Sequence, residues 1–135
     1  MNANRNCPFC EIVSSDKARR IIAETEHAIA IRDGYPISEG HTLIIPKRHF
    51  ASFFDATDAE RLALLHLLET EKQRLDKELS PNGYNMGIND GVAAGQSVPH
   101  LYIHLIPRYV GDVEDPRGGI RWIMPHKAKY WSEGE

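Results

Sequence analysis

The sequence predicts a single long helix, over residues 57–79, and its neighbours in the chain decide the fold class. The helix begins at Thr57-Asp-Ala-Glu60, whose residue types and spacing fit a capping box. Leucines then recur at spacings of four and seven residues, with charged residues between them, as expected for the apolar face of a helix. Ser80-Pro81-Asn82-Gly83 ends the pattern, because these residue types favour a turn.

Short apolar runs on both sides of this helix predict strands. The runs at 27–33 and 41–46 precede the helix, and the runs at 84–88 and 98–107 follow it. Pro99 has no amide donor, so we expect it at the start or the edge of the last strand. Strands, one long helix and further strands together favour an α+β fold with a mostly antiparallel sheet.

The size and charge of the chain exclude several classes of protein. Its 135 residues, 41% hydrophobic and 26% charged, are ordinary for one globular domain that needs no disulfide bonds. The net charge of −3 gives no sign of binding to nucleic acids or to anionic membrane surfaces. There is no run of about 18 apolar residues, and residues 1–10 lack the apolar core of a signal peptide. We therefore expect a cytoplasmic protein without nucleic acid or membrane partners.

The two cysteines form a Cys-x-x-Cys pair, Cys7-Pro-Phe-Cys10. In a reducing compartment such a pair is more often a metal or redox site than a disulfide. A thioredoxin-like pair should follow a strand and open a helix, but no strand is expected before Cys7. A zinc site needs two more ligands, for which His49 and His100 are candidates. Four protein ligands would leave no open position, so the metal would be structural; the alternative is that His49 is a solvated loop residue.

Two histidines in the last predicted strand suggest chemistry. On a strand, His100, Tyr102 and His104 share one face, and the two histidines would lie about 13 Å apart, too far for one ligand atom. His104 follows the glycine-rich stretch 89–97, whose amides could cradle phosphate oxygens. That stretch has neither a P-loop nor a GxGxxG signature, so His104 could equally be a hydrogen-bonded core residue. His41 opens a strand, where capping explains it more readily than catalysis.

Five segments of the chain together resemble one known family. They are CPFC, GHTLIIPKRH, GYNMGINDG, AGQSVPHLYIHLIPRY and DPRGGIRW, and the match is colinear over nearly the whole chain. On these motifs the chain is identified as a member of the histidine triad (HIT) family, of the bacterial zinc-containing type. The resemblance implies a single HIT domain over 1–135, with a zinc-binding arm at about 1–15 and a C-terminal tail at about 110–135. It also implies the HIT-like fold and a homodimer in which two sheets join.

The resemblance further implies a function in purine nucleotide chemistry. Family members hydrolyse or transfer nucleoside monophosphates from substrates such as diadenosine polyphosphates and nucleoside phosphoramidates. Their motif is His-φ-His-φ-His-φ-φ, where φ is apolar, and the central histidine attacks the α-phosphorus. By position, Asp33 resembles the ribose-binding acid, and His104 the third histidine, which contacts the phosphate. Asn89, Gln96 and Ser97 resemble the contacts to the phosphate and the leaving group.

Many bacterial members of the family also hold a zinc ion. Its ligands are the N-terminal Cys-x-x-Cys, the histidine after Pro-Lys-Arg and the first histidine of the triad. Cys7, Cys10, His49 and His100 match this arrangement. The resemblance thus implies a structural Zn²⁺ as the cofactor.

Tyr102 stands where the family has its nucleophilic histidine. At pH 7 most of an imidazole is neutral and able to attack, whereas about one phenol in a thousand is ionised, which costs about 4 kcal/mol. Tyrosine can act as a covalent nucleophile, but an aryl phosphodiester should persist longer than a phosphorylated imidazole. Three hypotheses follow: a HIT nucleotide hydrolase or transferase with reduced activity, a nucleotide-binding module without catalysis, and a zinc-stabilised interaction scaffold. An engineered His-to-Tyr change would leave the same sequence.

Overall fold

A computed structural model describes residues 6–14, 18–132 and 134. Its helices are α1 (Pro8–Ser14) and α2 (Asp58–Leu79), and its strands are β1 (Ile21–Glu24), β2 (Ala28–Arg32), β3 (Thr42–Pro46), β4 (Gly83–Gly87) and β5 (Ile103–Arg108). Short 3₁₀ turns occur at Ala18–Arg20, Phe53–Asp55, Val92–Ala94, Gly119–Ile123 and Pro125–Lys127. Within these described residues, no helix combines the length and the apolarity that crossing a membrane requires.

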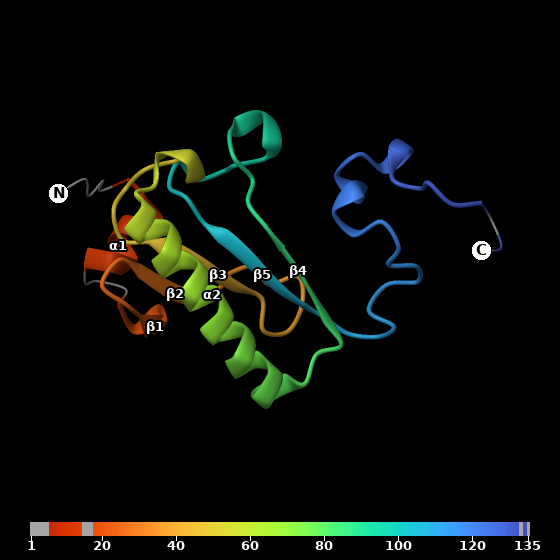
Figure 1. Ribbon diagram of the computed structural model, residues 1–135, viewed down its shortest axis with the longest axis horizontal. Helices are drawn as coiled ribbons and strands as arrows, with labels where there is room; N and C mark the ends of the chain where they lie inside the picture. Colours follow the sequence, from red (N-terminus) through yellow and green to blue (C-terminus); the bar gives the residue numbers. More distant parts are fainter. Residues whose placement is uncertain (1–5, 15–17, 133, 135) are drawn as a thin grey trace.

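The strands form one five-stranded sheet in the order β1-β2-β3-β5-β4 (Figure 1). Every neighbouring pair is antiparallel, so the predicted α+β class with an antiparallel sheet is confirmed. β1 was not predicted from the sequence; it is a short edge strand whose register with β2 shifts between Ile21 and Ala23.

The two helices cover opposite faces of the sheet, because successive side chains of a strand point to opposite sides. Ile44 of β3 packs with Leu64 and Leu67 of α2. Its neighbour Ile45 belongs to a second cluster, which includes Phe9 of α1. α2 runs along the whole sheet, whereas α1 covers only one end of the other face (Figure 1). The rest of that second face remains available for a site.

The N-terminus of α2 has the predicted capping box, and an ion pair reinforces it. Thr57 accepts the amide of Glu60, and the Glu60 carboxylate accepts the amide of Thr57. Arg48 donates two hydrogen bonds to the same carboxylate, at 2.9 and 2.8 Å. These bonds lower the pKa of Glu60 to about 2, against the opposing effect of burial. The turn that carries His49 is therefore fixed against the start of α2 by this charged pair.

The last strand is shorter than predicted. β5 begins at Ile103, so that His100 and Tyr102 precede it rather than lying within it. The amide of His100 donates to the carbonyl of Val98 at 2.8 Å, which closes a tight turn around Pro99. The amide of Leu101 donates to the carbonyl of Phe50 at 2.7 Å. Since the amides of His100 and Leu101 donate to Val98 and Phe50 rather than to a neighbouring strand, residues 98–102 do not extend the sheet.

The chain continues beyond β5 as an irregular C-terminal segment that lies next to the edge strand β4 (Figure 1). A Cβ atom at Gly119 would lie 3.4 Å from the side chain of Asn85 in β4. Trp122 donates a hydrogen bond to the carbonyl of Arg117 at 2.7 Å, and the Arg117 guanidinium stacks over Trp131 at 4.5 Å. The last two contacts join residues of the segment to one another, whereas Gly119 approaches β4; Met86 of β4 remains 54% exposed.

Candidate functional site

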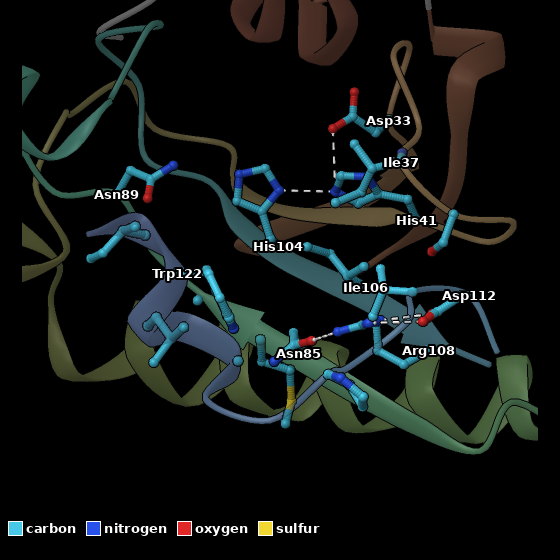
Figure 2. A pocket seen from close by; sticks show the side chains of 18 of the residues that line it. Asp33, Ile37, His41, Asn85, Asn89, His104, Ile106, Arg108, Asp112 and Trp122 are labelled. Carbon is cyan, nitrogen blue, oxygen red and sulfur yellow. Dashed lines mark hydrogen bonds and ion pairs between the residues drawn. The ribbon is translucent and has the colours of Figure 1, made fainter. Parts of the chain in front are cut away.

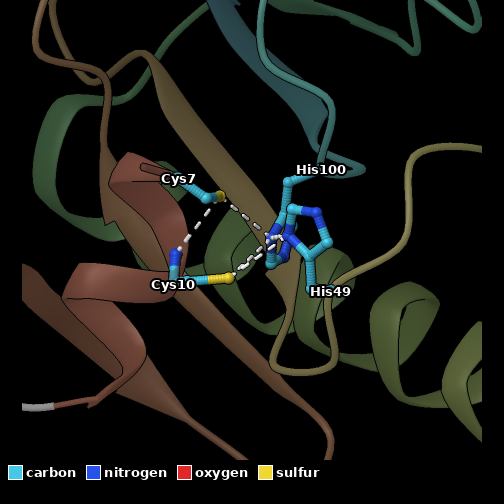
Figure 3. A group of neighbouring side chains, drawn as sticks. All are labelled: Cys7, Cys10, His49 and His100. Carbon is cyan, nitrogen blue, oxygen red and sulfur yellow. Dashed lines mark hydrogen bonds between the residues drawn. The ribbon is translucent and has the colours of Figure 1, made fainter. Parts of the chain in front are cut away.

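Cys7, Cys10, His49 and His100 converge from three separate parts of the chain (Figure 3). Cys7 immediately precedes α1, and Cys10 lies in its first turn. His49 follows β3, and His100 lies in the turn before β5. Cys7, Cys10 and His100 are buried, and His49 is half-buried. The four ligand atoms all lie within 4.8 Å of one another. The structure thus brings together all four residues predicted to bind zinc.

The distances between these atoms fit a tetrahedral ion. The Sγ of Cys10 lies 3.2 Å from the Nδ1 of His49 and 3.6 Å from the Nδ1 of His100. The Sγ of Cys7 lies 3.4 Å from the Nδ1 of His100, and the two imidazole nitrogens are 3.2 Å apart. Zn–N bonds of about 2.05 Å and Zn–S bonds of about 2.3 Å separate tetrahedral ligands by about 3.3–3.8 Å. These four separations are therefore close to those between the ligands of a tetrahedral zinc ion.

The protonation of His100 also suits a metal ligand. Its Nε2 lies 2.8 Å from the carbonyl oxygen of Pro46. A carbonyl only accepts, so Nε2 carries the proton, and the lone pair of Nδ1 points at the cysteines. Burial lowers the pKa of His100 to about 4, although the bond to Pro46 opposes this effect. The neutral ring is the form that binds metal, so the cluster fits a structural Zn²⁺ with no open position for substrate.

A second group of polar residues lies in a pocket of about 1040 Å³ on the same face of the sheet (Figure 2). The C-terminal segment forms one wall of this pocket, and β4, β5 and the turn between β2 and β3 form the others. Its apolar lining residues include Ile37, Ile88, Ile106, Ile120, Trp122 and Ile123. Asp33, His41, Asn89 and His104 provide polar groups at one end. A large apolar pocket with a few convergent polar groups is the usual form of a small-molecule site.

Asp33, His41 and His104 form a connected cluster. Nε2 of His41 lies 2.9 Å from Nδ1 of His104 and 3.3 Å from Oδ2 of Asp33. The strand register explains this contact. Leu43 of β3 pairs with His104 of β5, so His41, two positions before Leu43, is the diagonal neighbour of His104 on the same face of the sheet. Gly40 makes the turn before His41, with a φ of +90°; a Cβ atom there would lie 2.8 Å from Leu75 of α2.

Burial controls the charge of this cluster. It lowers the pKa values of both His41 and His104, and the nearby carboxylate of Asp33 opposes the shift in each. The other oxygen of that carboxylate accepts the amide of Tyr35 at 2.9 Å. Burial therefore favours the neutral form of both imidazoles, beside a single carboxylate.

The opposite end of the pocket contains a second charged group. Arg108 donates to both oxygens of Asp112 at 2.8 Å and to Oδ1 of Asn85 at 2.6 Å (Figure 2). These bonds raise the pKa of the Arg108 guanidinium and hold the pKa of Asp112 well below its usual range. The ion pair stays charged at any ordinary pH, and it fixes the start of the C-terminal segment to β5.

The loop residues expected at the phosphate divide into two groups. Asn89 lines the pocket with Asp33 and His104. Gln96 instead bonds to the protein backbone. Its Oε1 accepts the amide of Gly91 at 2.8 Å, and its Nε2 donates to the carbonyls of Ala51 and Val98. Ser97 points at Tyr102. The structure thus brings Asp33, Asn89 and His104 together, but Gln96 and Ser97 are used in contacts within the protein.

Tyr102 is buried between the Cys/His group predicted to bind zinc, called the metal cluster below, and the pocket; 7% of its surface is exposed. Its ring packs edge-on against Phe9, at 5.4 Å, and against His104, at 5.3 Å. Phe9 also packs against His100, at 5.7 Å. The Tyr102 hydroxyl lies 3.4 Å from the amide nitrogen of Ser97 and 3.3 Å from its Oγ. The Tyr102 hydroxyl is therefore within hydrogen-bonding distance of both the amide and the side chain of Ser97.

His41 was not predicted to belong to the site. Its position at the start of a strand favoured a capping role, yet the structure places His41 at the centre of the cluster with Asp33 and His104. One signal could have found it. His41, Leu43 and Ile45 share one face of a strand, and the two apolar members place that face inward, so the histidine faces inward too.

Comparison with known proteins gives the family. The HIT domain model matches residues 14–111. A HIT-like protein of 16.1 kDa from Mycoplasma pneumoniae is 42% identical over 108 residues, 79% of this chain and 74% of that protein. The adenosine 5'-monophosphoramidase hnt1 of Schizosaccharomyces pombe is 36% identical over 132 residues, 95% of this chain and 94% of that enzyme. A zinc-bound histidine triad protein from Mycobacterium smegmatis has a TM-score of 0.73 at 36% identity, over 79% of this chain and 78% of that one.

The fold, the Cys/His cluster and these matches agree. The chain belongs to the HIT family, and its five-stranded antiparallel sheet with the long helix α2 is the fold of its structural neighbours.

Proposed function

We propose that this protein binds purine nucleotides in the pocket beneath the C-terminal segment and hydrolyses or transfers nucleoside monophosphates slowly. The observation that carries the proposal is the convergence of Asp33, Asn89 and His104 at one end of an apolar pocket. Such a pocket suits a purine base and a sugar phosphate together. The similarity to an adenosine 5'-monophosphoramidase supports an adenosine phosphoramidate as the first substrate to try, with diadenosine polyphosphates as the second.

Each polar group has a distinct role in this proposal. The carboxylate of Asp33 accepts hydrogen bonds from the ribose hydroxyls, and Asn89 and His104 contact the phosphate. The isoleucines and Trp122 enclose the base. Tyr102 stands at the position of the nucleophile and lies next to His104. Its hydroxyl is engaged by Ser97, which supports reduced turnover.

Two alternatives remain distinct from this proposal. In one, the protein binds nucleotides and catalyses nothing, which the burial of Tyr102 and its bonds to Ser97 favour. In the other, it is a zinc-stabilised interaction scaffold. In all three cases we propose one HIT domain whose N-terminal arm, about residues 1–15, is held by Zn²⁺ on Cys7, Cys10, His49 and His100, and whose tail, about 110–135, covers the pocket.

Calorimetry with AMP tests the binding proposal. We expect AMP to bind, and an Asp33→Asn variant to bind it about tenfold more weakly, because charged hydrogen bonds contribute roughly 1.5–3 kcal/mol. A 2',3'-dideoxy analogue should lose affinity for the original protein but lose nothing further with the variant. Asp58→Asn, in a carboxylate that is 98% exposed on α2, is the matched control. Absence of heat at millimolar AMP would refute nucleotide binding and leave the scaffold.

We also propose that two copies form a homodimer through exposed apolar residues of α2 and β4. Leu62 is 69% exposed, Leu65 52% and Met86 54%, more apolar surface than a helix and an edge strand need to present to water. Light scattering should give twice the 15.3 kDa of one chain. Leu65→Glu should shift the mass toward 15.3 kDa, and Val92→Glu, at an 87% exposed loop position, should not. A single-chain mass for the original protein at all concentrations contradicts this proposal.

A further inference from the structure

We propose that His41 is a positioning residue that fixes His104 as a neutral imidazole with its proton on Nε2, directed at the pocket. His104 is then a hydrogen-bond donor, and neither a nucleophile nor a base. The backbone amide of Ile37 and the two rings are sufficient to fix these protons. The use of this donor on a phosphate rests on the function proposed above, but the protonation itself does not.

The amide of Ile37 determines the protonation of His41. This N–H donates to Nδ1 of His41 at 3.2 Å. An amide nitrogen cannot accept, so Nδ1 of His41 must present its lone pair. The neutral ring of His41 therefore carries its proton on Nε2.

His41 in turn determines the protonation of His104. Nε2 of His41 and Nδ1 of His104 are 2.9 Å apart, a distance that requires one hydrogen between them. That hydrogen belongs to His41, so Nδ1 of His104 accepts. A neutral His104 consequently holds its own proton on Nε2. Among the described residues no hydrogen-bond partner of this Nε2 is found, and the ring lines the pocket (Figure 2).

A charged cluster would break this arrangement. An imidazolium at position 104 would point a proton from Nδ1 at the Nε2–H of His41, and an imidazolium at position 41 would point one at the amide of Ile37. The groups that face the pair are Asp33, at 3.3 Å from His41, and the phenol of Tyr102, whose ring centroid is 5.3 Å from that of His104. Burial outweighs the carboxylate and lowers both imidazole pKa values, in agreement with two neutral rings.

The position of the imidazole proton distinguishes this cluster from the metal cluster. Asp33, His41 and His104 also bring three ligand atoms within 4.8 Å of one another. Metal binding needs a lone pair, but Nε2 of His41 is protonated. At His100 the situation is reversed: Nε2 donates to a carbonyl, and the lone pair of Nδ1 faces the other ligands. One cluster is therefore suited to a metal ion and the other to a chain of hydrogen bonds.

Nitrogen NMR of the full-length, zinc-loaded protein tests the proposal without any ligand. Long-range ¹H–¹⁵N spectra at pH 7 should show both His41 and His104 with a protonated Nε2 and an unprotonated Nδ1. In His41→Leu, His104 should become a mixture of tautomers. In His41→Gln, whose amide N–H can take the place of Nε2–H, His104 should keep its single form. His66, exposed on α2, is the internal reference and should not change.

Other results overturn the inference. A proton on Nδ1 of His104, a charged His104 at pH 7, or no change in His41→Leu would each do so. In a Tyr102→His background, His41→Leu should lower kcat about tenfold with little effect on KM, and His41→Gln should restore kcat. A tenfold change corresponds to about 1.4 kcal/mol, which is within the range for one hydrogen bond. If AMP does not bind but the NMR result holds, only the proposed function fails; if AMP binds and the tautomer is different, only this inference fails.

Discussion

Replacing Tyr102 with histidine is expected to raise the rate of AMP release from an adenosine phosphoramidate by about a thousandfold. The reason is the population of the attacking form. At pH 7 most of an imidazole with a pKa near 6.5 has a lone pair to attack with, whereas a phenol with a pKa near 10 is ionised in about one molecule in a thousand. That difference amounts to about 4 kcal/mol in the barrier. The measurement is kcat for the two proteins under the same conditions.

The surroundings of Tyr102 make this substitution informative. The smaller imidazole would leave the hydroxyl position beside Ser97 open, which frees the Ser97 amide and Oγ for a phosphate oxygen. It would also leave a small space beside Phe9, so a loss of about 1–2 kcal/mol in stability is expected. Thermal unfolding of the variant separates that loss from the change in kcat.

Tyr102→Phe is the matched control, because it removes the hydroxyl and keeps the packing. We expect it to bind AMP at least as tightly as the original protein and to release no AMP above background. If the original protein turns over as fast as Tyr102→His, and Tyr102→Phe abolishes that turnover, the phenol is the nucleophile and the reduced-activity proposal is wrong. Mass spectrometry would then find AMP attached to Tyr102 after a single turnover.

Loss of the metal cluster should have the largest effect on stability. Metal analysis is expected to find about one zinc ion per chain. His49→Gln should remove most of it and lower the melting temperature by about 10 °C or more, because a structural zinc ion contributes several kcal/mol and 1 kcal/mol corresponds to roughly 4 °C at this size. A chelator should have a similar effect on the original protein.

His66→Gln removes the same kind of side chain from an exposed position on α2 and should change neither quantity. A metal-free preparation of the original protein with an unchanged melting temperature would disprove the structural role. If zinc binds but only three of the four residues are needed for it, the ion has an open position, and a metal-activated water has to be considered.

Local patterns were sufficient to predict most of the fold. The helix over 57–79 has both a capping box and a regular apolar face, and α2 occupies Asp58–Leu79. The strands expected at 27–33, 41–46 and 84–88 correspond to β2, β3 and β4. β1 was missed because it is four residues long and pairs on one side only.

The candidate site was less accessible to sequence reasoning. Cys7 and Cys10 are recognisable by their spacing. His49 and His100 were candidate partners from their positions next to predicted strands, and the family resemblance supported that choice. Nothing local connects His41 to His104, which is 63 residues away; only the antiparallel register brings them together. The bond between Ser97 and Tyr102 spans only five positions, but it depends on the turn around Pro99, which the expected long strand did not include.

The metal cluster connects parts of the chain that are far apart in sequence. Cys7 and His100 are separated by 93 positions, so an ion bound to both closes most of the polypeptide into one loop. Closing so long a loop removes conformational freedom mainly from the unfolded chain. A short terminal helix such as α1 would otherwise fray before the rest of the domain. If its cysteines share an ion with His100 as proposed, α1 opens only when the turn before β5 opens as well, and it should share the lifetime of the central sheet.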